Sequence, residues 1–145
     1  MTKKIYIINA NYYEEISNRL ISGAITYLNK IDLSYEIVNV PGALEIPSAI
    51  NIINNNLNSN DFDIGFIAIG CVIRGETSHY DIVARQSAEG LIHLSLTQNI
   101  IISDSILTVE NKKQALDRSL EDSTNKGYHA ANACCRLLDI KNGNL

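Results

Sequence analysis

The segment GCVIRGETSHYD, residues 70–81, combines residue types that could bind an anion and transfer protons. It directly follows DIGFIAI at 63–69, which is apolar enough to be a buried strand. A helix that begins near Ser78 would leave the N–H groups of 76–79 free to bind a phosphate. His79, in the first turn of that helix, is the residue type that exchanges protons near neutral pH. The segment therefore predicts an anion site with a general acid–base group beside it.

Two further segments could complete such a site. In VPGALEIP (40–47), the backbone of 43–45 could hydrogen-bond a polyhydroxylated ligand, or Glu45 could only complement a helix dipole. Tyr12 and Tyr13 could stack on a heterocycle, or they could simply cover the edge of a sheet. The residues alone leave both alternatives open.

The polar groups near the two predicted helix starts also have simple alternative explanations. Arg118 in QALDRS could bind a phosphate with two N–H groups, or it could pair with Asp122 four residues later on a solvated helix face. Thr77 and Ser78 could only cap their helix, and His79 could be an ordinary surface residue. Position at the end of a buried strand favours the functional interpretation of His79.

The elements that must position these residues alternate along the chain. Four apolar segments predict strands at 3–10, 34–40, 63–73 and 100–109. Apolar or small residues at helical spacing predict buried faces on three helices: Ile16, Leu20, Ala24 and Leu28 in 13–30; Val83, Ser87, Leu91 and Leu94 in 78–96; Ala130, Cys134, Leu137 and Leu138 in 127–141. Pro47 suits the first turn of a helix, Asn111 and its neighbours offer acceptors ahead of another, and Gly127 is expected to separate a short helix from the last one.

This alternation predicts an α/β fold with a parallel sheet covered by helices on both faces. Ligands of such folds bind beyond the carboxyl ends of the strands, where the segments at 9–13, 40–45 and 71–79 converge. The first strand is not followed by G-x-G-x-x-G, so the sequence does not indicate a dinucleotide site.

Composition narrows the classes of protein that are possible. The 145 residues carry a net charge of -4, which argues against a nucleic-acid surface. No apolar run approaches the length of a membrane span, and the first ten residues predict a strand and not a signal peptide. Cys71, Cys134 and Cys135 lack metal-ligand spacing, so we expect buried thiols, no metal, and a cytoplasmic location.

Taken together, VPGALEIP, GCVIRGETSHYDIV, LTVEN with QALDR, and NKG before an alanine-rich helix closely resemble the 6,7-dimethyl-8-ribityllumazine synthase family. The resemblance runs from about Ile5 to Leu138. It implies a single domain over 1–145 with a flavodoxin-like fold: a three-layer αβα sandwich around a four-stranded parallel sheet. It also implies condensation of 5-amino-6-(D-ribitylamino)uracil with 3,4-dihydroxy-2-butanone 4-phosphate, the penultimate step of riboflavin biosynthesis, without a cofactor or metal.

The resemblance assigns a role to each matching residue. The implied roles are stacking on the pyrimidine for Tyr12, ribityl binding for Ala43, Leu44 and Glu45, lining of the pyrimidine site for Cys71, Val72 and Ile73, phosphate binding for Glu76, Thr77 and Arg118, and catalytic proton transfer for His79. It further implies a homo-oligomer in which His79 and Arg118 of one active site come from adjacent subunits.

Two departures from the family pattern change these expectations. Asp104 stands where many members carry a phenylalanine that packs on the pyrimidine, so we expect a hydrogen bond to the heterocycle in its place. The segment RSLEDSTNKG lacks the glycine-rich turn often found in members that form sixty-subunit capsids. A pentamer is therefore expected in preference to a capsid.

Two other classes of function remain as alternatives. A flavin- or lumazine-binding module would keep the pocket without catalysis, but it would not need both His79 and Arg118. A flavodoxin-like or receiver-like signalling domain would need a phosphate loop or an acidic cluster after the first strand, and INANYY provides neither.

Overall fold

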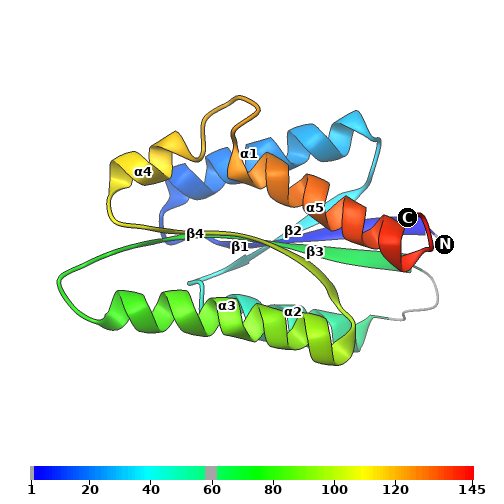
Figure 1. Cartoon of the computed structure of the whole chain (residues 1–145), viewed down its shortest axis with the longest axis horizontal. Coiled ribbons are helices and arrows are strands. Elements are labelled where there is room, and N and C mark those ends of the chain that lie inside the picture. Colours follow the sequence, from blue (N-terminus) through cyan, green and yellow to red (C-terminus); the bar gives the residue numbers. More distant parts are fainter. Residues whose placement is uncertain (1, 58–61) are drawn as a thin grey trace.

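The computed structural model describes residues 2–57 and 62–145, and these form strands and helices in alternation (Figure 1). In chain order they are β1 (Thr2–Ala10), α1 (Glu14–Lys30), β2 (Tyr35–Val40), α2 (Glu45–Asn56), β3 (Phe62–Ile73), α3 (His79–Gln98), β4 (Ile101–Val109), α4 (Lys112–Asp117) and α5 (Lys126–Lys141). The predicted strands are confirmed, and so is the place of Pro47 in the first turn of α2.

The described strands form one parallel sheet in the order β2-β1-β3-β4. Helices α1, α4 and α5 lie over one face of the sheet, and α2 and α3 lie over the other (Figure 1). The predicted three-layer sandwich is therefore confirmed. Because all the strands run the same way, their carboxyl ends meet at one edge, where the loops to α1, α2, α3 and α4 begin.

Each face of the sheet buries its own hydrophobic core. Ile7, Leu20, Ile67 and Leu138 belong to the core under α1 and α5, and Ile8, Ile50, Phe66 and Leu91 belong to the core above α2 and α3. The predicted buried faces of α1 and α3 are confirmed. On α5 the prediction is wrong for Leu137, which is 38% exposed because it lies beside the open edge strand β4, where no further strand covers it.

Gly127 does not separate two helices, as the sequence suggested, because α5 already begins at Lys126. The helix start is fixed by Asn125, whose side-chain oxygen accepts hydrogen bonds from Gly127 N (2.8 Å) and Tyr128 N (3.1 Å). A Cβ atom added at Gly127 would collide with the carbonyl oxygen of Leu20 in α1. The glycine therefore permits the close approach of α1 and α5.

We expect Gly127→Ala to lower the free energy of unfolding by about 1–3 kcal/mol, because the two helix backbones must move apart. Urea unfolding measures the change. Gly75→Ala is the matched control, since a Cβ there would meet no atom within 4 Å, and it should leave stability nearly unchanged. Equal stability of Gly127→Ala and the unmodified protein would contradict the packing role.

A charged cluster around a buried carboxylate lies at the other end of the sheet, at the amino end of β3. Asp63 is 2% exposed and accepts hydrogen bonds from Lys141 Nζ (3.0 Å) and Asn142 Nδ2 (2.6 Å). Burial alone would raise the pKa of Asp63, but the bonds from Asn142 and Lys141 outweigh it, and the pKa lies below its usual value of 3.8. The cluster thus ties the end of α5 to the central sheet.

The depressed pKa makes the contribution of Asp63 to stability depend on pH. It is fully present above pH 3.8 and is lost as the pH falls through the lower pKa of the folded protein. Asp63→Asn should therefore cost about 1–3 kcal/mol at pH 7 and less near pH 3. Denaturant unfolding at both pH values tests this.

The matched control is Asp139→Asn. Asp139 pairs with Lys3 at 3.1 Å, but its side chain is 41% exposed, so we expect a loss below about 1 kcal/mol. A cost of Asp63→Asn that stays the same at pH 7 and pH 3 would contradict the assignment.

Candidate active site

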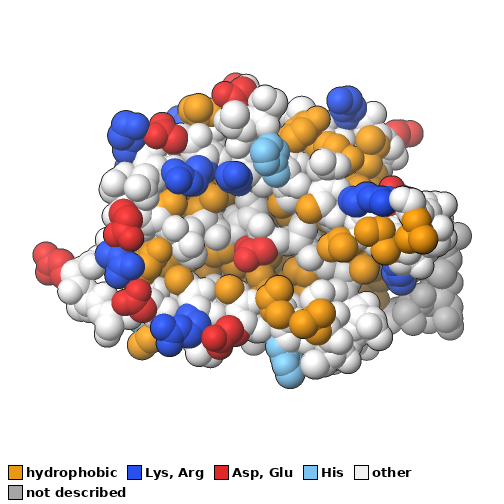
Figure 2. Space-filling model, viewed as in Figure 1, with side chains coloured by type: hydrophobic (Ala, Val, Ile, Leu, Met, Phe, Trp, Pro, Cys, Tyr) orange, Lys and Arg blue, Asp and Glu red, His pale blue; other side chains and the backbone are white. Residues whose placement is uncertain are grey.

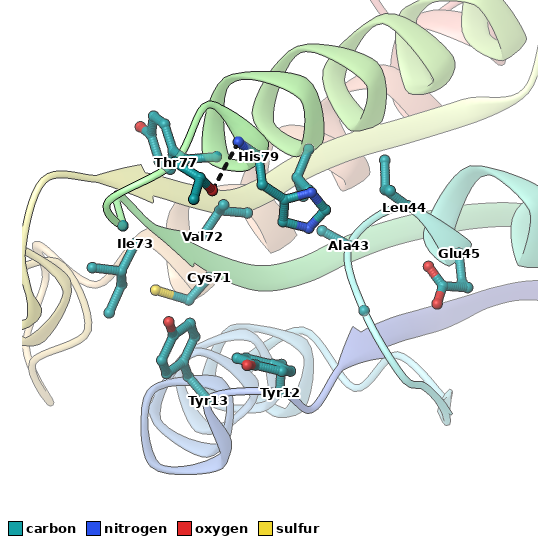
Figure 3. A pocket seen from close by; sticks show the side chains of 14 residues that line it. Tyr12, Tyr13, Ala43, Leu44, Glu45, Cys71, Val72, Ile73, Thr77 and His79 are labelled. Atoms are coloured by element: carbon teal, nitrogen blue, oxygen red, sulfur yellow. Dashed lines mark hydrogen bonds between the residues drawn. The ribbon is translucent and has the colours of Figure 1, made fainter.

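A pocket of about 340 Å³ opens at the carboxyl ends of β1, β2 and β3 (Figure 3). Many of the residues predicted to form the site line it together: Tyr12, Ala43, Leu44, Glu45, Cys71, Val72, Ile73, Thr77 and His79. His79 reaches the pocket from α3, while Tyr12 and Tyr13 come from the β1–α1 connection on the opposite side. The fold thus assembles most of the predicted site within one chain.

The two tyrosines form the aromatic wall of the pocket. Their rings meet edge to face with centroids 5.0 Å apart. Tyr13 packs against the core, and burial, followed by the neighbouring Tyr12 and Cys71, raises the pKa of its phenol. Tyr12 is 76% exposed, so its ring is available to a flat ligand and does not serve to cover the sheet.

The last residues of β3 supply an uncharged wall. Cys71 is buried and free, and burial raises the pKa of its thiol to about 11. The thiol is therefore protonated near pH 7 and behaves as a small apolar group. Val72 and Ile73 continue the same wall, so this side of the pocket suits a ring more than an ion.

The loop between β3 and α3 presents unbonded backbone donors. Thr77 Oγ1 accepts a hydrogen bond from the N–H of His79 at 3.3 Å, whereas Ser78, at the N-cap position, makes no capping bond with its side chain. Among the hydrogen bonds of the described residues, none uses the N–H of Glu76, Thr77 or Ser78. These donors lie at the N-terminus of a helix, the usual environment of a bound phosphate. The side chain of Glu76 is exposed and does not line the pocket.

The β2–α2 connection forms the remaining wall. Its turn is closed by hydrogen bonds from Glu45 N to Gly42 O and from Ile46 N to Ala43 O, both 3.2 Å. Glu45 is the first residue of α2 and also lines the pocket. Its carboxylate lies in the first turn of α2, where it complements the helix dipole, and the segment 43–45 borders the pocket, so this position does not exclude either interpretation.

Arg118 and Asp104 do not join this pocket. They line a second cavity of about 500 Å³ along β4 and α5, together with Lys126 and His129. Arg118 donates from Nη1 to the carbonyl oxygen of Gln114 at 3.0 Å. The alternative pairing of Arg118 with Asp122 is wrong: among the described residues Asp122 accepts hydrogen bonds from Thr124, and the guanidinium of Arg118 bonds to Gln114 O instead.

Asp104 lies on the exposed edge strand of the sheet. Its Oδ1 accepts a hydrogen bond from Ile106 N at 2.7 Å, which leaves the other oxygen available. Its side chain is open to water, but the surrounding groove removes enough solvent to raise its pKa, against the bond from Ile106 N–H. Figure 2 shows this face, where hydrophobic side chains lie between α3 and α5 and basic side chains border them above.

Some residues that line the pocket were not predicted to belong to the site. Val83 lies four residues after His79 on the same helix face, so helical spacing would have found it. Tyr80 and Gly42 also line the pocket, and both lie inside the motifs quoted from the sequence.

The described residues contain neither a metal-binding cluster nor a membrane-spanning helix. In the described part of the chain, no three His, Cys, Asp or Glu residues lie close enough to hold a metal ion. No described helix is both long and apolar enough to cross a membrane.

Comparison with known proteins identifies the family. The family model for 6,7-dimethyl-8-ribityllumazine synthase matches residues 2–142. The chain belongs to the 6,7-dimethyl-8-ribityllumazine synthase family. A protein of that name from Bartonella tribocorum is 45% identical, over 97% of this chain and 93% of its own length. Relatives of the same name from Bartonella henselae and Afipia carboxidovorans are 44% and 41% identical, over 94% and 95% of this chain and 87% and 85% of their own lengths. The resemblance expected from the motifs is confirmed.

Proposed function

We propose that residues 1–145 form a single lumazine synthase domain that acts in riboflavin biosynthesis. It condenses 5-amino-6-(D-ribitylamino)uracil with 3,4-dihydroxy-2-butanone 4-phosphate to 6,7-dimethyl-8-ribityllumazine, with release of phosphate and water. The observation that carries the proposal is the pocket itself, which His79 and the loop with the unbonded N–H groups line together with an aromatic and apolar wall. The free, buried cysteines support a cytoplasmic location.

Each wall of the pocket suits one part of the substrates. Tyr12 stacks on the pyrimidine, with Cys71, Val72 and Ile73 along its edge. The turn that carries Ala43, Leu44 and Glu45 binds the ribityl hydroxyl groups. The loop with Glu76 and Thr77 holds the phosphate through backbone N–H groups at the start of α3.

The reaction needs proton transfers and close contact between two substrates. The amine of the pyrimidine adds to the ketone and water leaves, phosphate is eliminated, and ring closure expels water again. His79 exchanges the protons in these steps, from the first turn of α3. Holding both substrates in one pocket supplies much of the acceleration.

We further propose that each active site is shared between adjacent subunits of a homo-oligomer, with a pentamer favoured over a sixty-subunit capsid. The support is the placement of Arg118 and Asp104 in a cavity separate from that of His79. A ring with head-to-tail contacts would bring the second cavity of one chain to the first pocket of its neighbour. Arg118 would then bind the phosphate, and the available oxygen of Asp104 would accept a hydrogen bond from the heterocycle.

Formation of the lumazine, followed by its absorbance and fluorescence, tests the activity directly. His79→Ala should lower kcat by about 10²-fold and leave binding of both substrates nearly intact, since general acid–base catalysis supplies that order of acceleration. His93→Ala is the matched control, because His93 is exposed on the same helix and does not line the pocket. Binding of both substrates without turnover in the unmodified protein would favour a binding module over an enzyme.

Mixing two inactive variants tests the shared site. When His79→Ala and Arg118→Ala proteins are unfolded together in equal amounts and reassembled, about a quarter of the sites should pair an intact His79 with an intact Arg118. Activity should recover accordingly, with mixed rings confirmed by native mass spectrometry. Mixed rings that stay at the activity of the single variants would show that each site belongs to one chain.

A further inference from the structure

Arg74 connects two loops at the carboxyl end of the sheet. It directly follows β3, and its N–H donates to Val109 O at 2.9 Å. Its guanidinium donates from Nε to Glu110 at 2.8 Å and from Nη1 to Asp81 at 3.3 Å, and its Cζ lies 4.4 Å from the centre of the Tyr80 ring. Tyr80 and Asp81 are the two residues after His79, so the arginine holds the turn of α3 that carries the histidine.

The backbone of Glu110, the partner of Arg74 ahead of α4, is held by a hydrogen bond. Glu110 N–H donates to the side-chain oxygen of Gln114 at 2.8 Å, and Gln114 N–H donates to the side-chain oxygen of Asn111 at 2.9 Å. These two bonds cap α4 and hold the backbone of Glu110 in place. Arg74 therefore bonds to an exposed carboxylate whose backbone is fixed at the start of α4.

The loop that Arg74 begins has few other attachments. An added Cβ at Gly75 would meet no atom within 4 Å. Among the described contacts, the side chains of Glu76, Ser78 and His79 form no hydrogen bond or ion pair, and Thr77 bonds only to the N–H of His79. The guanidinium of Arg74 is thus the main side-chain tether of the loop.

We propose that Arg74 is a positioning residue that fixes the 75–78 loop and the first turn of α3 against Glu110, and so places the phosphate-binding N–H groups and His79 for the reaction. This inference rests on the proposed function. Arg74 does not line the pocket and so acts through the loop and not on the substrate. Its planar guanidinium engages two carboxylates and one ring at once, which the ammonium group of a lysine would not reproduce.

Exposed ion pairs usually contribute little to stability, so the effect of Arg74 should be on geometry and catalysis. We expect Arg74→Ala to lower kcat/KM for the phosphate-bearing substrate about tenfold, because small displacements of catalytic groups reduce rates strongly. The KM of the pyrimidine substrate should change less, and the midpoint of unfolding should shift little. Arg74→Lys should recover only part of the loss.

A second variant tests whether the effect depends on the contact with Glu110. Glu110→Ala should give a similar kinetic loss, and the double variant with Arg74→Ala should be no worse than the more impaired single variant. Losses that multiply in the double variant would overturn the proposal, as would an unchanged kcat/KM in Arg74→Ala.

Arg19→Ala is the matched control. Arg19 is similarly exposed (38% against 42% for Arg74) and pairs with Glu15 at 3.4 Å outside the pocket. It should leave activity and both KM values unchanged. An equal loss in this control would show that the kinetic effect is not specific to Arg74.

Amide hydrogen exchange separates this proposal from the proposed function. Exchange at Asp81 and Ile82, whose N–H groups donate to Ser78 O at 3.0 and 3.3 Å, should increase in Arg74→Ala and Glu110→Ala, but not in Arg19→Ala, whether or not the protein makes the lumazine. If the unmodified protein makes no lumazine and the two variants still exchange faster, the tether is supported and the proposed reaction is rejected. Unchanged exchange would overturn the tether even if the protein is fully active.

Discussion

The arrangement of the molecule depends on the parallel pairing of its central strands. The register aligns Ala10 with Val40 and Asn9 with Ile69, so β1 and β2 end level with each other and β3 continues past them to Ile73. Both faces of this sheet are buried, and a polar group placed there without a partner would lose its hydration. Side chains with chemical function are therefore restricted to the strand ends, and the loops that leave them become the walls of one pocket.

The same constraint explains how much of the site the sequence could reveal. The place of His79 at the pocket was predictable because a continuous apolar strand precedes it, and such strands end at the binding edge of α/β folds, whereas the place of Cys71 came from the family resemblance. The buried faces of α1 and α3 were predictable because each helix meets one core, which imposes a helical period on its apolar residues. Local sequence patterns were sufficient to predict a helix or strand wherever one of its faces packs against a core.

Other features depend on contacts between distant parts of the chain, which local patterns do not record. Leu137 fits the apolar spacing of α5, but it lies beside the open edge of the sheet. Gly127 looks like a helix breaker in the sequence, but a glycine is needed there because the backbone of α1 lies too close for a side chain. The family resemblance groups Arg118 with Glu76 and Thr77, although the fold places it in another cavity. Arg74 is exposed and polar, so only its partners in space distinguish it from an ordinary surface residue.

The charged cluster of Asp63, Lys141 and Asn142 lies at the amino end of β3, and the pocket lies at its carboxyl end. From Asp63 to Cys71 the strand spans roughly 26 Å at its usual rise per residue. Activity often limits how far a protein can be stabilised, because groups that bind or react are rarely the most stabilising ones. Here the Asp63 cluster and the pocket lie at opposite ends of one strand, so a substitution that changes the stability of the cluster leaves the walls of the pocket in place.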